Sequence, residues 1–399
     1  MENTHLKADA KRYAYLKAAF EEQFGHTPSR ARLFSSPGRA EIVGNHTDHN
    51  RGKVIVAALS CNVLCLAEPR TDGIIEISSA GFRPIRFPIT DTEKKEGEKG
   101  KSPAFARGVI HYLKEKGLPV GGFSAVTESN IFRGAGVSSS AAFSVLVAEV
   151  ENALYLGGRL TPLEKAIAAQ YAENEYFGKP CGLLDQTGIA LGGLNEVDFM
   201  TDTPAFRKLP PPEGYSVVLT ATGGSHAELT EHYAAVRNEM GQVAAYFCKK
   251  YLREVEPEDV LRELPALRKA TSDRAVLRAL HFFEENGRVE RAAEGLLSGD
   301  IPAFLASVRE SGESSLRYLQ NCSVPGSVDQ PLVMGLKISE MLIKRGAFRM
   351  MGGGFTGTVL AIVPDGDAKE YGAQMARVFG EENVFYAALR EEGACEMEI

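Results

Sequence analysis

An aspartate among apolar residues is the first candidate for chemistry in this sequence. Asp185 stands in the run CGLLDQTGIAL, within the segment 172–188. A carboxylate in apolar surroundings needs a partner, and we expect Arg39 to be that partner. The same segment carries Glu173 late in a predicted helix, ahead of a glycine turn, which suits magnesium ligation beside a residue that activates a hydroxyl. Taken alone, Glu173 would more often be a surface charge.

A second group of polar side chains is concentrated in the loop 36–52, SPGRAEIVGNHTDHNRG. Its donors and acceptors belong to Arg39, Asn45, His46, Asp48, His49 and Asn50. This density matches a polyhydroxylated substrate, which is held by several hydrogen bonds at once. Two other interpretations stay open. The histidines and the aspartate could ligate a metal, although no further ligand cluster stands out, or the loop could be a solvated turn without function.

The Gly-rich segment RGAGVSSSAA, residues 133–142, lies between a predicted strand and a predicted helix. Its glycines permit close backbone approach, and the amides at a helix N-terminus attract anions. This suits a nucleoside triphosphate with Mg²⁺, bound by Gly134, Ala135, Gly136, Val137, Ser138, Ser139 and Ser140. The segment is neither a Walker A loop nor a Rossmann GxGxxG fingerprint, and a Gly/Ser linker is the alternative. A further glycine-rich turn at 346–357 by itself indicates only a hairpin.

These loops must be positioned by a mixed set of strands and helices. Apolar or alternating runs predict strands at 32–35, 53–67, 122–127, 216–221 and 358–363. Helices are predicted up to Gly25, at 105–116, at 139–155, from Pro162 to near Gly178, and at several places between 229 and 344. Thr161 and Glu164 predict the N-cap of the fourth of these. The mixed order lacks regular βαβ alternation, so we expect an α+β fold.

Length and charge narrow the class of protein. A chain of 399 residues with 44% hydrophobic residues should hold about two domains, which we place at 1–200 and 201–399. Lys and Arg total 45 against 52 Asp and Glu, and the net charge of −7 argues against nucleic acid or anionic membrane as a partner.

Further patterns bear on the compartment. No run approaches the roughly 20 apolar residues of a membrane span, and the first residues lack the apolar core of a signal peptide. Six scattered cysteines without a CxxC pair indicate neither a disulfide framework nor a zinc site. We therefore expect a cytoplasmic protein.

Taken in order, the motifs resemble the signatures of the GHMP kinases, and among these the galactokinases. PGRAEIVGNHTDHNRG resembles their sugar loop, GAGVSSSAA their ATP loop, CGLLDQ the segment with the catalytic aspartate, and RMMGGGFTG their third motif. The resemblance extends from about Phe34 to Val363. It implies a GHMP kinase fold, with an N-terminal domain like domain 2 of ribosomal protein S5, a C-terminal α+β domain, and sugar and ATP in the cleft between them.

The resemblance also implies roles for individual residues. Asp185 takes the catalytic position, and Arg39 polarises it or steadies the transferring phosphoryl group. Ser140 and Glu173 take the magnesium position. The residues that fall on sugar-binding positions are Asn45, His46, Asp48, Gly182, Asp185 and Tyr233. Whether the aspartate removes the hydroxyl proton or orients the nucleophile stays open, because phosphoryl transfer depends mainly on positioning and electrostatics.

The implied activity is transfer of the γ-phosphate of ATP to the anomeric hydroxyl of galactose, giving galactose 1-phosphate and ADP. We expect a monomer, with a homo-oligomer as the alternative. Three departures from the family pattern affect the choice of sugar. Asn45 replaces a common glutamate that helps to hold the hydroxymethyl end, His49 replaces a tyrosine, and Arg133 replaces a proline. The alternatives are therefore a GHMP kinase for another monosaccharide and a catalytically silent sugar sensor.

Overall fold

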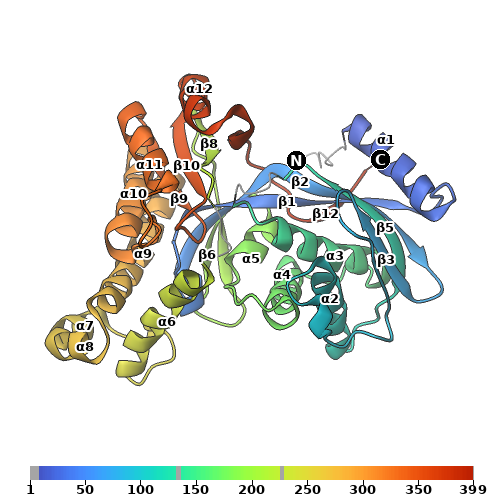
Figure 1. Cartoon of the computed structure of the whole chain (residues 1–399), viewed down its shortest axis with the longest axis horizontal. Helices are drawn as coiled ribbons and strands as arrows, with labels where there is room; N and C mark the ends of the chain where they lie inside the picture. Colours follow the sequence, from blue (N-terminus) through green and yellow to red (C-terminus); the bar gives the residue numbers. More distant parts are fainter. Residues whose placement is uncertain (1–8, 132–135, 225–228, 399) are drawn as a thin grey trace.

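The larger of two sheets carries the polar segment 36–52, which comprises the end of strand β1 and the connection to strand β2 (Figure 1). The computed structural model describes residues 9–131, 136–224 and 229–398. The strands of this sheet are β1 (Arg32–Val43), β2 (Lys53–Arg70), β3 (Ile74–Ser79), β4 (Ile85–Pro88), β5 (Gly122–Ser129), β6 (Leu194–Asp198), β7 (Ala205–Leu209) and β12 (Cys395–Met397). Their order is β12-β1-β2-β5-β3-β4, and β6 pairs with both β2 and β7. The pair β3–β5 is parallel, whereas β1–β2 and β2–β5 are antiparallel.

Helices cover both faces of this sheet, so its strands are apolar on both sides (Figure 1). The helix α1 (Ala10–Phe24) lies on one face, where Leu16 packs with Leu64 and Leu66 of β2. Val63 and Cys65, which alternate with these leucines along β2, belong to the core on the other face. That face is covered by α2 (Ser102–Glu115), α3 (Ser139–Tyr155), α4 (Pro162–Tyr171) and α5 (Leu184–Leu191).

The smaller sheet is antiparallel and has the order β11-β8-β10-β9. Its strands are β8 (Tyr215–Ala221), β9 (Ala347–Met351), β10 (Thr358–Pro364) and β11 (Val384–Ala387). One face packs against α11 (Pro331–Leu342) and α12 (Ala368–Phe379) through a cluster that includes Val218 and Met375. The other face contributes Leu219 and Leu360 to the core that it shares with the larger sheet.

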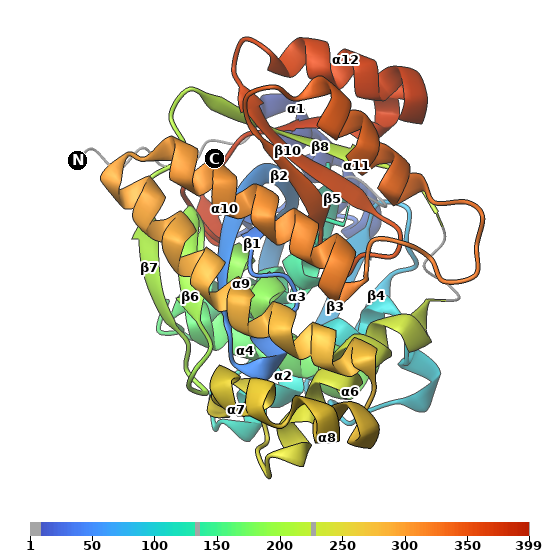
Figure 2. The same cartoon turned by 90° about the vertical axis from the view of Figure 1, so that its left-hand side faces the viewer.

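Along the chain, a group of helices lies between β8 and β9 of the smaller sheet, and it faces the viewer in Figure 2. They are α6 (Thr230–Tyr246), α7 (Pro257–Arg262), α8 (Leu264–Ala270), α9 (Asp273–Ser298) and α10 (Ile301–Ser314), which continues as the π-helix η5 (Ser315–Leu319). Short 3₁₀ turns occupy η1 (Asp48–Asn50), η2 (Glu96–Glu98), η4 (Leu252–Glu254) and η6 (Glu381–Asn383). The long helix α9 packs beside α10 and also contacts β1 and β2. It therefore reaches the strands that flank the loop 36–52.

Most of the elements expected from the sequence are confirmed. The helix at 139–155 has the predicted bounds, and Thr161 and Glu164 form the predicted capping box of α4. That helix runs on as the π-helix η3 (Ala172–Phe177) and ends at Gly178, as expected. The α+β fold class is confirmed as well.

Three segments differ from the expectation. The strand predicted at 32–35 continues to Val43, because two register shifts, at 37/39 and 41/43, let Pro37 and Gly38 lie within it. Asp185 lies in the first turn of α5, a helix that the sequence pattern did not indicate. The glycine-rich turn at 346–357 contains the strand β9.

The two sheets meet along the chain between Leu209, where β7 ends, and Tyr215, where β8 begins, while β12 returns to the larger sheet. The division into domains 1–200 and 201–399 stays a prediction. In the described part of the chain, no helix combines the length and the apolar character needed to cross a membrane.

Candidate active site

Asp185 and Arg39 meet as predicted, at the point where α5, β1 and the start of α3 converge. The Nε of Arg39 donates to Oδ1 of Asp185 at 2.7 Å. The hydroxyl of Ser138 donates to the other carboxylate oxygen. The Arg39 side chain is only 5% exposed, whereas that of Asp185 is 35% exposed. Asp185 thus has a buried anchor on one side and an open side that a ligand can reach.

The electrostatics of this pair keep Asp185 ionised. Burial acts to raise the pKa of Asp185, but the guanidinium of Arg39 and the hydrogen bonds from Arg39 and Ser138 outweigh it and hold the pKa below its usual value. The backbone also supports the contact. Ser138 has φ 60°, a left-handed conformation that L-residues seldom adopt without a reason in their surroundings.

The Gly-rich loop is fastened to the same arginine. Nη1 of Arg39 donates to the carbonyl of Gly136 at 2.6 Å, and the backbone N–H of Arg39 donates to the carbonyl of Val137 at 3.2 Å. Gly136 and Ser139 are exposed, and α3 begins at Ser139 with its amide groups at this end of the helix. Of the other predicted nucleotide-binding residues, Ser140 lies in the first turn of α3, whereas Gly134 and Ala135 lie outside the described residues.

Asp48 joins the β1–β2 loop (residues 44–52) to the turn before α5. Its Oδ1 accepts from the backbone N–H of His49 at 2.9 Å, and its Oδ2 accepts from that of Leu184 at 3.3 Å. A Cβ at Gly182 would lie 1.7 Å from Oδ2, so only glycine leaves room for the carboxylate. Burial, together with the nearby charge of Asp185, raises the pKa of Asp48 to about 6.

The glycine turn before β10 is held against the β1–β2 loop by its carbonyl groups. The carbonyl of Gly352 accepts from Nδ2 of Asn45 at 2.8 Å, and that of Gly353 accepts from Nε2 of His46 at 3.1 Å. The carbonyl of Gly354 accepts from the hydroxyl of Tyr233 at 3.0 Å. Three residues expected at the sugar are therefore brought together around one turn. His46 has φ 57°, and its Nδ1 lies 3.4 Å from Nε2 of His49.

Asn45 is placed differently from the expectation that its side chain faces a sugar. The residue is fully buried. Its Nδ2 donates to Glu41 at 3.0 Å as well as to Gly352, and its Oδ1 accepts from Ser315 at 3.2 Å and from Asn321 at 2.9 Å. These four bonds use the whole hydrogen-bonding capacity of an amide. In this arrangement the Asn45 side chain has none left for a sugar.

A buried ion pair behind Asn45 was missed by the sequence reasoning. Nη2 of Arg349 donates to Oε1 of Glu41 at 2.8 Å, and Nη1 donates to the carbonyl of Ile42 at 3.0 Å. Burial raises the pKa of Glu41, while the charge of Arg349 acts against this rise. The signal was present in the sequence, since Arg349 stands in the otherwise apolar strand AFRMM, where a charge needs a partner.

Glu173 lies on the π-helix η3, close in space to the segment of Asp185. Its Oε2 accepts from Nε2 of Gln186 at 2.9 Å, and its Oε1 is 3.8 Å from Nζ of Lys179. Burial raises the pKa of Glu173, and Lys179 opposes this rise. A carboxylate and the hydroxyl of Ser140 are oxygen donors of the kind that Mg²⁺ prefers. Among the described residues there is no cluster of three or more His, Cys, Asp and Glu that could hold a metal, so a metal site at His46, Asp48 and His49 gains no support.

Comparison with known proteins gives consistent matches in sequence. The model of the galactokinase galactose-binding signature matches residues 18–69, and that of the GHMP kinases N-terminal domain matches residues 104–193. A galactokinase of Actinobacillus pleuropneumoniae serotype 5b is 32% identical over 360 residues, which cover 87% of this chain and 88% of the relative. The human galactokinase is 31% identical over 399 residues, with 96% of each protein covered.

The solved structures agree in fold. The crystal structure of the Lactococcus lactis galactokinase complexed with galactose superposes with a TM-score of 0.83 at 24% identity, covering 97% of this chain and all of the other. A mevalonate kinase structure reaches a TM-score of 0.60 at 16% identity, over 90% of this chain and 99% of the other. The expected GHMP kinase fold is thereby confirmed, and the chain belongs to the galactokinase family of the GHMP kinases.

Proposed function

We propose that this chain transfers the γ-phosphate of ATP to the anomeric hydroxyl of galactose, giving galactose 1-phosphate and ADP. The observation that carries this proposal is the arrangement of Asp185, which is held by Arg39 and Ser138 and is open on one side. Arg39 also fixes the carbonyls of the Gly-rich loop, so one arginine links the acidic residue to the predicted nucleotide site. The relatives named galactokinase and the galactose-bound structure support the choice of sugar.

In the proposed reaction the sugar hydroxyl lies beside Asp185. The hydroxyl oxygen forms a bond to the γ-phosphorus as the bond between that phosphorus and the β,γ-bridging oxygen breaks, and ADP leaves. The hydroxyl proton passes to the carboxylate of Asp185. Because the pKa of this carboxyl is held below its usual value, Asp185 is a weak base. Its main role is therefore to orient the hydroxyl, and it accepts the proton late in the transfer.

For the sugar we propose contacts from the part of the site that adjoins Asp185. Asp48 offers a carboxylate that can accept two sugar hydroxyls in charge-assisted bonds, and Gly182 lies against it. His46 donates through Nε2 to the glycine turn and its Nδ1 is 3.4 Å from Nε2 of His49, so a sugar hydroxyl would replace one of these two partners. Tyr233 donates its hydroxyl proton to the same turn, and we propose that it borders the sugar there. Asn45 is not among these contacts.

For the nucleotide we propose the N-terminal end of α3 and the loop residues 134–140 before and within it. Exposed amide groups at a helix start and adjacent serine hydroxyls suit phosphate oxygens. Mg²⁺ bound with ATP would be held by Ser140 and Glu173, and it would offset negative charge on the β- and γ-phosphates. Because ATP is the phosphoryl donor, we also propose that the protein works in the cytoplasm. We further propose that it is a monomer.

The test is the substitution Asp185→Asn, which keeps the shape and removes the charge. We expect kcat to fall by roughly two to four powers of ten, the range of a general acid-base residue, while galactose and ATP still bind in calorimetry. Asp329→Asn, an exposed change of the same kind, is the matched control and should leave kcat unaltered. Retained turnover in Asp185→Asn would remove this residue from the chemistry.

A second candidate, a kinase for a related monosaccharide, is favoured by the burial of Asn45. Without a contact from residue 45, discrimination at the hydroxymethyl end of the sugar should be weaker than with a glutamate facing it. Comparing kcat/KM for galactose and L-arabinose, which lacks that group, decides between the two. A catalytically silent sensor is disfavoured because Asp185, Arg39 and Ser138 are assembled for turnover.

A further inference from the structure

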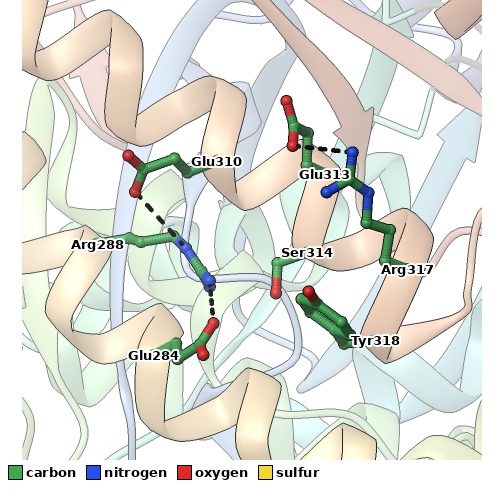
Figure 3. Close-up of a pocket in the computed structure, with 7 residues that line it drawn as sticks. All are labelled: Glu284, Arg288, Glu310, Glu313, Ser314, Arg317 and Tyr318. Carbon is green, nitrogen blue, oxygen red and sulfur yellow. Dashed lines mark hydrogen bonds and ion pairs between the residues drawn. The ribbon is translucent and has the colours of Figure 1, made fainter.

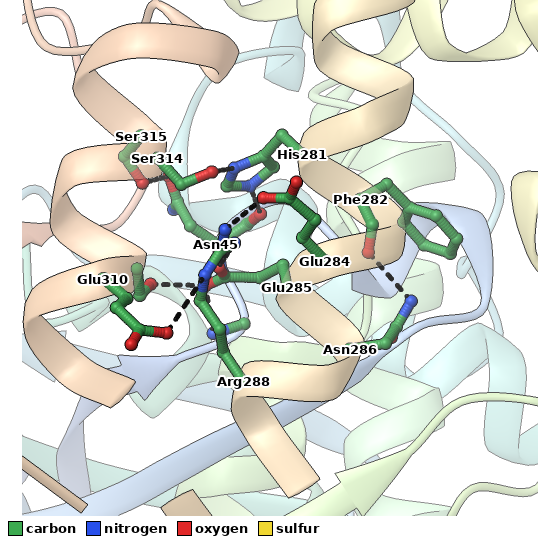
Figure 4. Close-up of polar contacts among 12 residues, drawn as sticks. Asn45, His281, Phe282, Glu284, Glu285, Asn286, Arg288, Glu310, Ser314 and Ser315 are labelled. Carbon is green, nitrogen blue, oxygen red and sulfur yellow. Dashed lines mark hydrogen bonds and ion pairs between the residues drawn. The ribbon is translucent and has the colours of Figure 1, made fainter. Parts of the chain in front are cut away.

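The backbone of the β1–β2 loop is hydrogen-bonded by side chains of a helix more than two hundred residues away in the sequence. Two side chains of α9, His281 and Glu285, lie one helical turn apart and both are fully buried. Figure 4 shows them beside Asn45. We call these two residues the α9 clamp. Neither touches Asp185 or the Gly-rich loop in any hydrogen bond of the described residues.

Glu285 holds the amide side of the loop. Its Oε1 accepts from the backbone N–H of Gly44 at 2.9 Å and from that of Asn45 at 3.2 Å, and the hydroxyl of Ser311 donates to the same oxygen. Its Oε2 accepts from Nη1 of Arg288 at 2.9 Å. Every one of these partners is a donor, so the group acts as an ionised carboxylate. Burial works against ionisation, but the charges of Arg349 and Arg288 and the hydrogen bond from Ser311 oppose it and hold the pKa of Glu285 below its usual value.

His281 holds the carbonyl side. Its Nε2 donates to the carbonyl oxygen of Asn45 at 3.0 Å, and its Nδ1 is 2.8 Å from the hydroxyl of Ser314. A carbonyl can only accept, which fixes the proton on Nε2 and makes Ser314 the donor to Nδ1. Burial lowers the pKa of His281, in keeping with a neutral ring. The clamp therefore fixes both the N–H and the C=O of residue 45.

The position that is clamped decides where the ligand-facing side chains point. Residue 45 directly precedes His46, whose left-handed φ of 57° turns the chain out of the sheet, and it lies three residues before Asp48. The last residue pair of the β1–β2 ladder is Val43 with Ile55, so Gly44 and Asn45 receive no strand partner in that ladder. Glu285 replaces the missing ladder acceptor at this point.

The positive charge that balances Glu285 belongs to Arg288, a largely buried residue at the border of a surface groove. Arg288 pairs with buried Glu285 and also with Glu284, and its Nε is 4.0 Å from Glu310. Figure 3 shows Arg288 at a surface groove of about 210 Å³, which is also lined by Glu284, Glu310, Glu313, Ser314, Arg317 and Tyr318. Glu284 is 58% exposed and touches Arg288 but not the loop, so it provides a matched control for Glu285.

We propose that Glu285 and His281 are positioning residues for sugar binding: by holding the peptide of residue 45 they aim His46 and Asp48 at the sugar. The proposal rests on the proposed function for the identity of the ligand. It assigns to α9 a role in sugar affinity that is separate from nucleotide binding and from the transfer step.

The test compares Glu285→Gln with Glu284→Gln in the full-length protein. In Glu285→Gln one end of the amide must present N–H groups to the donors that now surround the carboxylate, so the loop loses charge-assisted bonds. We expect the KM for galactose to rise by about 10- to 100-fold, the effect of losing a hydrogen bond to a charged group, while the KM for ATP stays within about twofold. Glu284→Gln should change neither value.

A second readout does not depend on the reaction. Amide hydrogen exchange of the ligand-free protein should be faster at Gly44 and Asn45 in Glu285→Gln than in the wild type, and unchanged in Glu284→Gln. If galactose proves not to be the substrate, this measurement still decides whether the clamp holds the loop. Should Glu285→Gln not fold, Ser311→Ala removes one donor from the same carboxylate oxygen and should shift both readouts in the same direction.

The proposal is overturned by unchanged exchange at Gly44 and Asn45, or by KM values for galactose and ATP that rise together. His281→Gln gives a further check, because a glutamine can still donate to the carbonyl of Asn45. It should keep a galactose KM near that of the wild type, whereas His281→Leu should raise it. Equal KM values for these two variants would remove His281 from the clamp.

Discussion

The substitution Asn45→Asp tests how the interior behind the β1–β2 loop is held together. It changes one amide nitrogen into a carboxylate oxygen and leaves the shape the same. In the wild type that nitrogen donates to Glu41 at 3.0 Å and to the carbonyl of Gly352 at 2.8 Å. After the change, an acceptor faces two acceptors in a fully buried place.

The magnitude follows from the protonation that this clash forces. Two carboxylates at about 3 Å cannot both be ionised in the interior, so the new group must hold a proton, with its pKa raised by roughly 2 to 3 units. Each unit corresponds to about 1.36 kcal/mol, so the free energy of unfolding should fall by about 3 to 4 kcal/mol near pH 7. The protonated group can donate to Glu41, but Gly352 loses its donor.

The pH dependence has a definite sign. The carboxyl of residue 45 would have a higher pKa in the folded protein than in the unfolded chain. Below about pH 4 both states carry the proton, and the deficit in stability is smallest. As the pH rises, the unfolded chain releases its proton first, so the deficit grows until the pH passes the pKa of the folded state.

Urea unfolding followed by circular dichroism at pH 5 and pH 8 measures this deficit. Asn130→Asp is the matched control, because Asn130 is exposed and its Oδ1, which accepts from the N–H of Asn62, is retained in aspartate. We expect the control to unfold like the wild type at both values of pH. A deficit below about 1 kcal/mol at pH 8, or one that does not change with pH, would refute the inferred buried position of the Asn45 amide.

Two further predictions concern the ligands. The pKa of Asp48, raised to about 6, predicts that kcat/KM for galactose falls as the pH drops below about 6, because the protonated carboxyl loses its charge-assisted bonds. The KM for ATP should stay level. A flat galactose profile between pH 5 and 8 would contradict this prediction. Replacing Glu173 by alanine should raise the Mg²⁺ concentration needed for half-maximal rate by about tenfold or more, with little change in the galactose KM. An unaltered Mg²⁺ titration would exclude Glu173 from the metal site.

The contacts that a sequence can predict are those in which a residue type has few options. Asp185 stands among apolar residues, so it needed a cation, and Arg39 in the other polar motif was the predicted one; the two are joined at 2.7 Å. The helix α3 was equally predictable, because a glycine-rich start and a long apolar run define it.

The placement of Asn45 could not be predicted in the same way. A polar side chain in a loop normally faces solvent or a ligand, and nothing nearby in the sequence indicates otherwise. Its partners Ser315 and Asn321 are 270 and 276 residues away, on segments whose approach depends on the packing of the whole chain. The helix α5 was missed for a different reason, since short apolar runs do not distinguish a helix from a turn or a strand.

The return of β12 to the edge of β1 has a consequence for synthesis of the protein. Arg32 and Glu396, which form an ion pair across this edge, are separated by 364 positions along the chain. At about 5 to 20 residues per second, a ribosome needs roughly 20 to 70 seconds between making one strand and the other. During that interval the backbone groups of residues 33–35 on the outer side of β1 lack their final partners. An unpaired strand edge of this kind is where chaperone binding, or pairing with another nascent chain, would begin.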